Sequence, residues 1–490
     1  GTIMPLSNAI MSLTRRPRSH RSGLRPRVYS AFHLCALLLI IGLTALLLPA
    51  PLGAQEAPAV TIEVAAGFDG AGQYRSSHWI PVQVTAATDG PDVRGELIWR
   101  FPGDGGVFRY DLDLPRGARK QIPLAVTSTE SPRTATVSIT ANGAELARSV
   151  VRLTPTPVEQ MLIGVVSSDP NALTTLSLIT TPNNVNAAVT RLNPAQLPGD
   201  AMLLAGLDVI FLHDLATEQL DPAHLAALEL WTRLGGQLVV GGGIHAEATT
   251  AGLAAWLPVD VGPLRNDVAT ESLGRLARRG DLGDSVPTLT ANAVTLRPGA
   301  RSLDNAGLIS AGDFGAGQVV FAAFDLAALR PWAGEANLWE RIVQPEARMI
   351  VGQSFRWRSE NLLRDTLQLP ALRLPSIGVL ALLVLSYIVV IGPVNFLLLR
   401  RLRRVELAWI TTPALVAIFL ALTYGSSFVL RGNQPQLTQL ALVQGFAGSA
   451  QAQSTTFLGL FSPQRRSYNL QTGPETLITP GGFEGFQFLT

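Results

Sequence analysis

Two long apolar runs dominate the hydrophobic pattern of the chain between residues 376 and 430. Each holds about 24 residues and, as a helix, would span roughly 36 Å, enough for a bilayer core of ~30 Å. Basic residues beside a span favour the cytoplasmic side. The pattern therefore predicts a transmembrane hairpin whose tip faces the cytoplasm and whose flanking segments lie outside. The tip carries four arginines, namely Arg400, Arg401, Arg403 and Arg404.

A shorter apolar run from Ala31 to Leu48 follows a segment that contains arginines but no acidic residue. The prolines and small residues at 49–54 are typical of the stretch before a signal-peptidase cut, although the run exceeds the usual core of about 7–15 residues. Residues 1–54 are therefore predicted to be a signal peptide or an uncleaved signal anchor. Either alternative exports the body that follows. The chain opens on Gly1 rather than Met, so Met4 or Met11 could be the native start, and we expect truncation at the C-terminal end.

Residues 55–155 form short, half-alternating runs separated by turn residues, which is typical of an immunoglobulin-like β-sandwich. Trp79 and Trp99 are its expected core anchors. The predicted strands are Val60–Ala65, Ile80–Thr85, Glu96–Phe101, Val107–Leu112, Lys120–Val126, Thr134–Thr140 and Glu145–Leu153.

Residues 158–350 change to apolar strands that alternate with helical patterns, which predicts an α/β layered domain with a parallel sheet. Its expected strands are Met161–Val166, Leu207–Leu212, Gln237–Val240 and Gln318–Asp325. Ala172–Ile179 is predicted as a helix, and a second helix begins at Asp221-Pro222, an N-cap followed by a proline at the first helical position. A linker helix is expected at 351–375. A partial, exported β domain is expected at 431–490.

Composition narrows the function classes. The formal net charge is only +2, and the exported body has no stripe of arginine or lysine residues, so nucleic-acid binding is not expected. The single cysteine, Cys35, lies in the N-terminal apolar run. The exported part therefore has no disulfide, thiol nucleophile or thiolate metal site. No motif predicts a cofactor.

Three stretches of the α/β region carry a resemblance: LDVIFLHD, LDPAHLAALELWTRLGGQLVVGGG and GAGQVVFAAFDL. They resemble the class I glutamine-amidotransferase-like domain of bacterial membrane proteins of unassigned function. The order of sandwich, α/β domain and hairpin is similar as well. The resemblance implies this fold, and active amidotransferases use a cysteine nucleophile with a histidine. Because this chain has no exported cysteine, we expect the domain to be catalytically empty.

Polar residues stand where the predicted parallel strands end, and ligands bind beyond the carboxyl ends of such strands. The candidate ligand crevice consists of Ser167, Asp169, His213, Asp214, Gly242, His245 and Asp325. A Ser/His/Asp hydrolytic set could be drawn from these positions with Ser168 added, but no G-x-S-x-G elbow appears. The glycine run 241–243 is not G-x-G-x-x-G, and no metal-ligand spacing links the histidines.

Asn395 is the strongly polar residue of the first span, where it is costly unless paired. Gly392-Pro393 should kink that helix, and Thr411 and Thr412 are the expected partners of Asn395.

We therefore expect a bacterial cytoplasmic-membrane protein that displays its main domains outside for binding or assembly, with the membrane and other envelope proteins as partners. The alternative is an envelope hydrolase that uses the His/Asp crevice. A third possibility is a subunit of a larger membrane complex whose partners fill the Asn395 seam.

Overall fold

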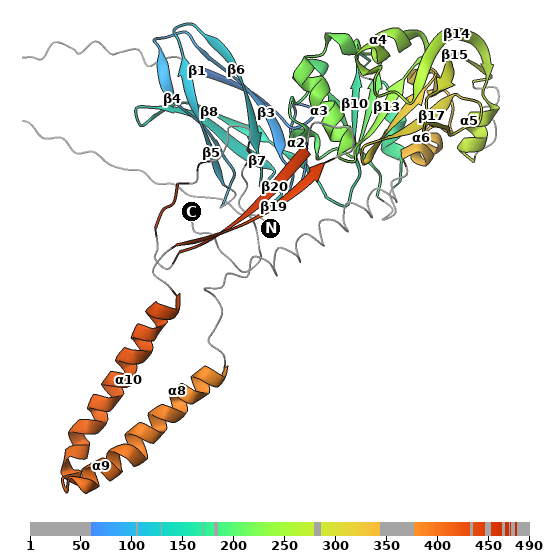
Figure 1. Ribbon diagram of the computed structural model, residues 1–490. Coiled ribbons are helices and arrows are strands. Elements are labelled where there is room, and N and C mark those ends of the chain that lie inside the picture. The colour runs from blue at the N-terminus through green and yellow to red at the C-terminus, as the bar shows by residue number, and fades with distance from the viewer. Residues whose placement is uncertain are drawn as a thin grey trace, which may run out of the picture. The chain divides into compact units, whose positions relative to one another are not determined.

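The computed structural model describes residues 60–343, 377–431, 435–445, 452–462, 466–469, 471 and 476–477, except 104–105, 129, 170, 181–184 and 279–285. The predicted signal segment at 1–54, including Cys35, and the predicted linker helix at 351–375 lie outside these residues. The first described domain is built from strands, the second mixes strands and helices, and two long helices and a two-stranded ribbon follow (Figure 1).

The first domain is a sandwich of two antiparallel sheets, with strand orders β1-β3-β6 and β5-β4-β7-β8. Its strands are β1 (Val60–Ala66), β3 (Ile80–Thr88), β4 (Val93–Arg100), β5 (Val107–Leu114), β6 (Arg119–Val126), β7 (Thr134–Ala141) and β8 (Ala144–Arg152). Strict alternation along β3 sends every second side chain into the core. Trp99 is fully buried there, whereas Trp79 is partly exposed. The predicted two-sheet sandwich is confirmed.

The second domain is organised around a seven-stranded sheet of order β11-β10-β12-β13-β18-β17-β16. The five strands from β11 to β18 are parallel, and β17 and β16 complete the edge in antiparallel pairing. β12 and β13 are buried along their whole length, as expected for strands covered on both faces. The strands are β10 (Leu162–Ser167), β11 (Ala188–Leu192), β12 (Val209–His213), β13 (Gln237–Gly241), β16 (Arg301–Ser302), β17 (Ile309–Phe314) and β18 (Gly317–Ala322).

Helix α3 (Pro222–Arg233) begins as its sequence predicts, because the Asp221 carboxylate accepts a hydrogen bond from Ala223 N–H and Pro222 follows it. The expected helix at Ala172–Ile179 is wrong. A short 3₁₀ helix, η1 (Thr174–Leu178), stands there instead. It follows Leu173, whose φ of 56° lies outside the right-handed helical region.

The remaining helices of this domain are α2 (Ala201–Leu204), α4 (Ala246–Thr250), α5 (Glu271–Leu276) and α6 (Glu335–Val343). A long antiparallel ribbon that the hydrophobic pattern did not predict pairs β14 (Val259–Ala269) with β15 (Thr288–Leu296). Its register shifts twice along the pair, and such irregularity weakens the alternation by which strands are recognised in a sequence.

A buried arginine joins the sandwich to the α/β domain. Arg75 lies on β2 (Gln73–Arg75), which pairs in parallel with β9 (Thr154–Thr156) where the chain leaves the sandwich. Its guanidinium donates to Asp208 Oδ2 at 2.8 Å. It also donates to three backbone carbonyls of the α/β domain and the segment that enters it, those of Val158, Gln160 and Gly206. Asp208 also accepts the N–H of Leu162 at 2.8 Å, so one carboxylate fixes Arg75 and the start of β10.

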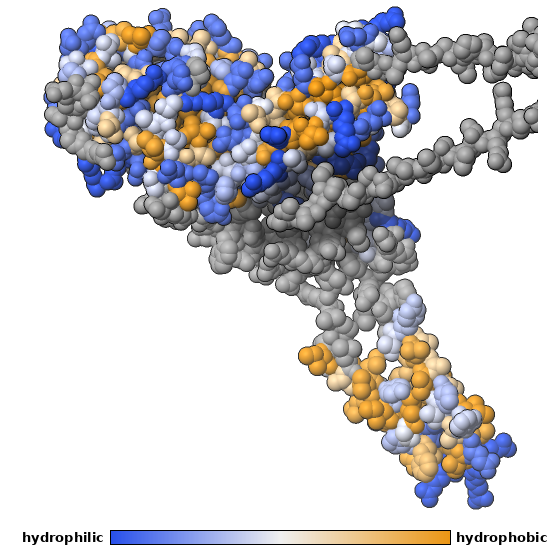
Figure 2. Space-filling model, turned by 180° about the vertical axis from the view of Figure 1, so that it is seen from behind, coloured by the Kyte–Doolittle hydropathy of each residue, from blue (hydrophilic) through white to orange (hydrophobic). Residues whose placement is uncertain are grey.

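Two helices of the chain are long and apolar enough to cross a membrane, Ile377–Arg401 and Val405–Gly425. The first combines α8 (Ile377–Val389), the π-helical turn η9 (Val390–Val394) and α9 (Asn395–Arg401), and the second lies within η10 (Val405–Leu407) and α10 (Ala408–Arg431). The π turn falls on Gly392-Pro393, since proline removes a helical hydrogen bond. Hydrophobic side chains cover both helices, and hydrophilic ones gather at their turn (Figure 2).

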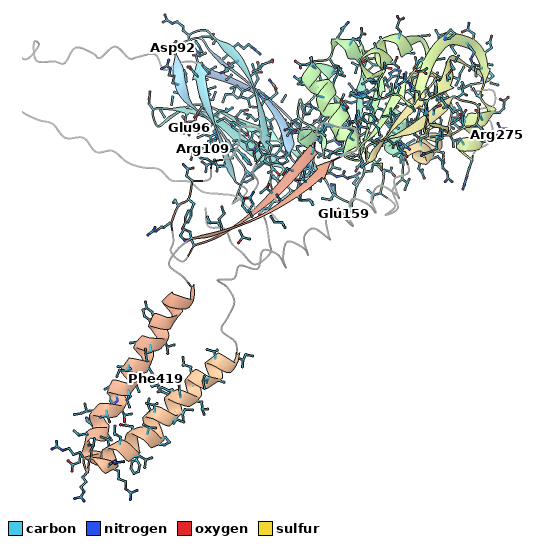
Figure 3. The ribbon with its side chains drawn as sticks, in the orientation of Figure 1. Asp92, Glu96, Arg109, Glu159, Arg275 and Phe419 are labelled. Carbon is cyan, nitrogen blue, oxygen red and sulfur yellow. The ribbon has the colours of Figure 1, made fainter. Side chains whose placement is uncertain are left out.

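The two helices contact each other through one polar and one aromatic pair. Asn395 is buried, and its Nδ2 donates to Thr412 Oγ1 at 3.4 Å. Tyr387 meets Phe419, labelled in Figure 3, edge to face with 5.3 Å between ring centroids. Thr411, the other expected partner, has a buried hydroxyl without a hydrogen bond among the described residues.

After the helices, β19 (Gln436–Gly445) and β20 (Ala452–Phe461) form a two-stranded antiparallel ribbon. These strands stand where the sequence predicts the opening of a β domain. The sequence predicts three strands in this segment, Leu437–Val443, Thr455–Phe461 and Ser467–Leu470. The third is not formed in its described part, because residues 467–469 have no regular structure.

We predict that Arg75→Ala destabilises the protein by about 3–5 kcal/mol, because removing one partner of a buried ion pair leaves the other uncompensated. The side chains of Arg75 and Asp208 are only 6% and 24% exposed. Thermal unfolding of the full chain in detergent measures the effect. The matched control is Arg109→Ala, which breaks an exposed pair with Glu96 at a similar N–O distance of 2.9 Å (Figure 3). Equal losses for the two variants would contradict the prediction.

Candidate functional site

The parallel register brings the polar residues of four strand ends to one edge of the sheet. Ser167, the last residue of β10, lies directly opposite His213, the last residue of β12. β13 and β18 continue the same edge, with Gly241 opposite Ala322, and Asp325 follows β18 three residues later. Parallel strands end at the same edge, so this placement follows from the topology alone.

Ser167, His213 and Asp325 form a continuous hydrogen-bonded chain. Ser167 Oγ lies 2.9 Å from His213 Nδ1, and His213 Nε2 lies 2.8 Å from Asp325 Oδ1. The His213 ring is buried, whereas Ser167 is partly exposed. Asp169 N–H also donates to Ser167 Oγ at 3.1 Å. Both ring nitrogens of His213 therefore have partners.

The charge state of Asp325 determines which group donates and which accepts in each of these hydrogen bonds. Burial raises the pKa of the Asp325 carboxyl, but the hydrogen bonds from His213 and Ala327 N–H, with the nearby histidine charges, outweigh burial and hold the pKa below its usual value. An ionised carboxylate only accepts hydrogen bonds, so His213 Nε2 carries the proton. In the neutral ring Nδ1 is then an acceptor, and the Ser167 hydroxyl donates to it.

A second pair lies on the solvent side of this chain. His245 Nδ1 is 2.8 Å from Asp214 Oδ1, and its Nε2 is 3.9 Å from Asp325 Oδ2. The side chains of His245 and Asp214 are 37% and 35% exposed. Ser168 donates to the other oxygen of Asp214, so this serine contacts a carboxylate and not an imidazole. Asp214 has a φ of 46°, which aspartate tolerates better than most residues.

Asp169 faces a cation that the sequence did not single out. Its Oδ2 accepts a hydrogen bond from Arg330 Nη2 at 2.8 Å, and its Oδ1 accepts the N–H of Asn171. The backbone hydrogen bond from Asn171 and the guanidinium of Arg330 hold the pKa of this carboxyl below its usual value. Arg330 ends the 3₁₀ helix η7 (Leu326–Leu329), which Asp325 caps, and no sequence spacing links it to Asp169.

The glycine run after β13 is a tight strand-to-helix turn, 3₁₀ helix η4 (Gly243–His245) leading into α4. Gly242 N–H donates to the carbonyls of Ala322 and Phe324, so this expected crevice residue is engaged in the fold. Gly243 has a φ of 74°, and a Cβ placed on it would lie 2.5 Å from the backbone nitrogen of Asp325. Asn292, buried on β15, accepts Gly243 N–H at 2.7 Å. The turn is therefore closed to any side chain at position 243.

Among the described residues, no group of three or more His, Cys, Asp and Glu side chains is arranged to hold a metal ion. The four arginines predicted at the hairpin tip are all exposed, at or near the turn between α9 and η10.

The sandwich matches a family model described as a domain of unknown function (DUF8726), over residues 59–154. No curated protein matches the chain. A solved CARDB domain from Pyrococcus furiosus, in complex with di-metal ions, is similar with 13% identity over 21% of this chain and 90% of its own, at a TM-score of 0.17.

Two solved glycosidases are similar over a longer stretch. One is a beta-galactosidase from Bacillus circulans sp. alkalophilus, with 13% identity over 38% of this chain and 31% of that chain, at a TM-score of 0.23. The other is an exo-beta-1,4-mannosidase from Opitutaceae bacterium strain TAV5, with 14% identity over 39% of this chain and 35% of that chain, at a TM-score of 0.22. The similarity spans about a third of each enzyme. At these TM-scores none of the three likenesses carries an argument about function.

We predict that Asp325→Asn destabilises the protein at neutral pH by about 1.5–3 kcal/mol, the contribution of hydrogen bonds to a charged group. Because the folded-state pKa of Asp325 is lowered, its stabilisation is present above the unfolded pKa of about 4 and is lost as pH falls through the folded value. The difference in melting temperature between wild type and variant should therefore narrow on acidification from pH 6 to pH 3.

The control for this experiment is Asp313→Asn, whose carboxylate is 76% exposed and lies 3.8 Å from Arg301. Its difference from wild type should stay small across the same pH range. A difference for Asp325→Asn that does not change with pH would contradict the inferred ionisation of Asp325.

Proposed function

We propose that this chain is a membrane-anchored, extracytoplasmic protein of the bacterial envelope that binds a ligand or assembles with a partner through the carboxyl edge of its α/β sheet. In this proposal the α/β domain is amidotransferase-like but has lost the nucleophile of that chemistry. The observation that carries the proposal is the closed turn at Gly243.

A nucleophile on a strand-to-helix turn needs a sharp, strained backbone that exposes its side chain at the top of the sheet. The turn from β13 into η4 has this strained backbone at Gly243, with its positive φ, yet the backbone of Asp325 occupies the space of a Cβ. A residue with a side chain there would displace Asp325 and with it the hydrogen bond to His213. This packing, together with the absence of an exported cysteine, supports the proposed loss of the nucleophile.

The binding role rests on what the same edge exposes. Ile244 follows Gly243 within η4 and is 64% exposed. His245 and Asp214 lie beside it, half-exposed and paired with each other. We infer that Ile244, beside this polar pair, is the apolar centre of a contact with a protein or peptide partner, since such contacts combine an apolar centre with a polar rim.

The anchor and its orientation rest on charge and hydropathy. Two apolar helices end at a turn with four exposed arginines, and the arginines that precede the N-terminal apolar run favour the same side of the membrane. Both signals support an exported sandwich and an exported α/β domain.

Photo-crosslinking tests the binding edge. With p-benzoylphenylalanine at Ile244, we expect irradiation of bacterial cells that make the full chain to give a discrete crosslinked adduct, because this side chain would lie in the interface. The same amino acid at Val150, which is 65% exposed on β8, is the matched control and should give none. No adduct at Ile244, or the same adduct at both positions, would refute a partner at this edge.

Thiol labelling tests the orientation. In a Cys35→Ser background, Val150→Cys should react with a membrane-impermeant maleimide in spheroplasts, whereas Arg401→Cys at the hairpin tip should react only after permeabilisation. Both sites are exposed in the structure, so a difference in labelling reports the membrane side. Labelling of Arg401→Cys in intact spheroplasts would invert the proposed topology.

A further inference from the structure

The chain of contacts from Ser167 through His213 to Asp325 assigns a chemistry that the binding role does not require. We propose that Ser167 is a nucleophile for the hydrolysis of carboxylic esters, with His213 as its general base and Asp325 as the residue that positions the imidazole. This activity does not require a partner at Ile244, so either proposal can fail without the other.

The contacts match what an activated serine needs. A serine hydroxyl is a weak nucleophile until an adjacent base takes its proton, and the base must itself be oriented by a third group. Ser167 Oγ and His213 Nδ1 are 2.9 Å apart, and His213 Nε2 and Asp325 Oδ1 are 2.8 Å apart. Asp325 is in turn held by the N–H of Ala327 at 2.8 Å. In the chymotrypsin triad Nε2 contacts the serine and Nδ1 contacts the aspartate, whereas here the two nitrogens are interchanged. The same number of protons is shared among the three side chains.

His213 is more buried than either of its partners in the chain, with its side chain 6% exposed against 25% for Asp325. His213 is buried and shielded from water, whereas Ser167, at the end of its strand, is partly exposed and can meet a substrate. The neighbouring serine provides an internal comparison. Ser168 is exposed but donates to the carboxylate of Asp214, so it has no imidazole within hydrogen-bond distance to accept its proton.

The reaction needs no redox partner or co-reactant except water. Ser167 Oγ attacks the ester carbonyl carbon while its proton passes to His213 Nδ1. Collapse of the tetrahedral intermediate breaks the bond to the alcohol oxygen, which takes the proton from Nδ1, and leaves an acyl ester on Ser167. Water then gives a proton to Nδ1 and attacks the acyl carbon, and the carboxylic acid departs as Ser167 regains its proton. Esters are the substrate class because an alcohol leaves more readily than an amine.

The test uses the full chain in mild detergent and a fluorophosphonate probe, which phosphonylates activated serines. We expect time-dependent labelling, mapped by peptide mass spectrometry to Ser167, together with hydrolysis of p-nitrophenyl acetate. Ser167→Ala should abolish both, whereas Ser168→Ala should retain both. His213→Gln should lower the labelling rate at least ~100-fold, the usual contribution of general base catalysis.

Asp325 acts through His213, so its variants must be compared in a way that separates orientation of the imidazole from a purely structural role. Asp325→Glu, which keeps a carboxylate, should retain more of the labelling rate than Asp325→Asn. Circular dichroism and thermal melts establish that Ser167→Ala and Ser168→Ala fold. If the variants at His213 and Asp325 do not fold, these two serine variants alone test the proposal. Wild-type labelling no greater than that of Ser167→Ala, or labelling that maps to another serine, would overturn the proposal.

Discussion

The carboxyl edge of the α/β sheet depends on the position of Asp325. Its carboxylate accepts the Nε2 proton of His213 and the N–H of Ala327, so it fixes one imidazole and starts the helix that ends at Arg330. Its backbone nitrogen would lie only 2.5 Å from a Cβ on residue 243. One residue therefore orients the base beside Ser167 and closes the neighbouring turn to a nucleophile. Any change that moves Asp325 alters both features together.

The contact between Ser167 and His213 depends on the register of β10 against β12. β10 and β12 are held in pairing by a buried apolar core, and Asp208 ties the first residue of β10 to Arg75 of the sandwich. A one-residue slip of β10 against β12 would send Ser167 away from His213, because successive side chains point to opposite faces. The ion pair between Arg75 and Asp208 is thus linked to the polar chain that starts at Ser167 through a single strand, β10.

Apolar runs and strand-end residues allowed much of this architecture to be predicted. The seven sandwich strands, the four expected parallel strands and the two apolar helices stand where the hydrophobic pattern places them, because burial and period carry these signals. Ser167, His213, His245 and Asp325 were named from strand ends alone. The pairing among them was not predictable, since Ser167 and Ser168 or His213 and His245 are equivalent until a register selects one. Arg330 and Asn292 were missed because long-range contacts position them.

The two roles proposed for this edge do not exclude each other, because they use side chains at different strand ends. Ser167 and His213 lie at β10 and β12, with the base buried, whereas Ile244, His245 and Asp214 expose side chains over the turn that follows β13. The two sets meet at Asp325, whose carboxylate lies 2.8 Å from His213 and 3.9 Å from His245, and the two histidine rings face each other edge to face with 6.4 Å between centroids. A partner bound over Ile244 would rest against His245 and so act on the carboxylate that orients His213. If the two proposals are combined, occupancy of the exposed half of this cluster would alter the chemistry proposed for its buried half.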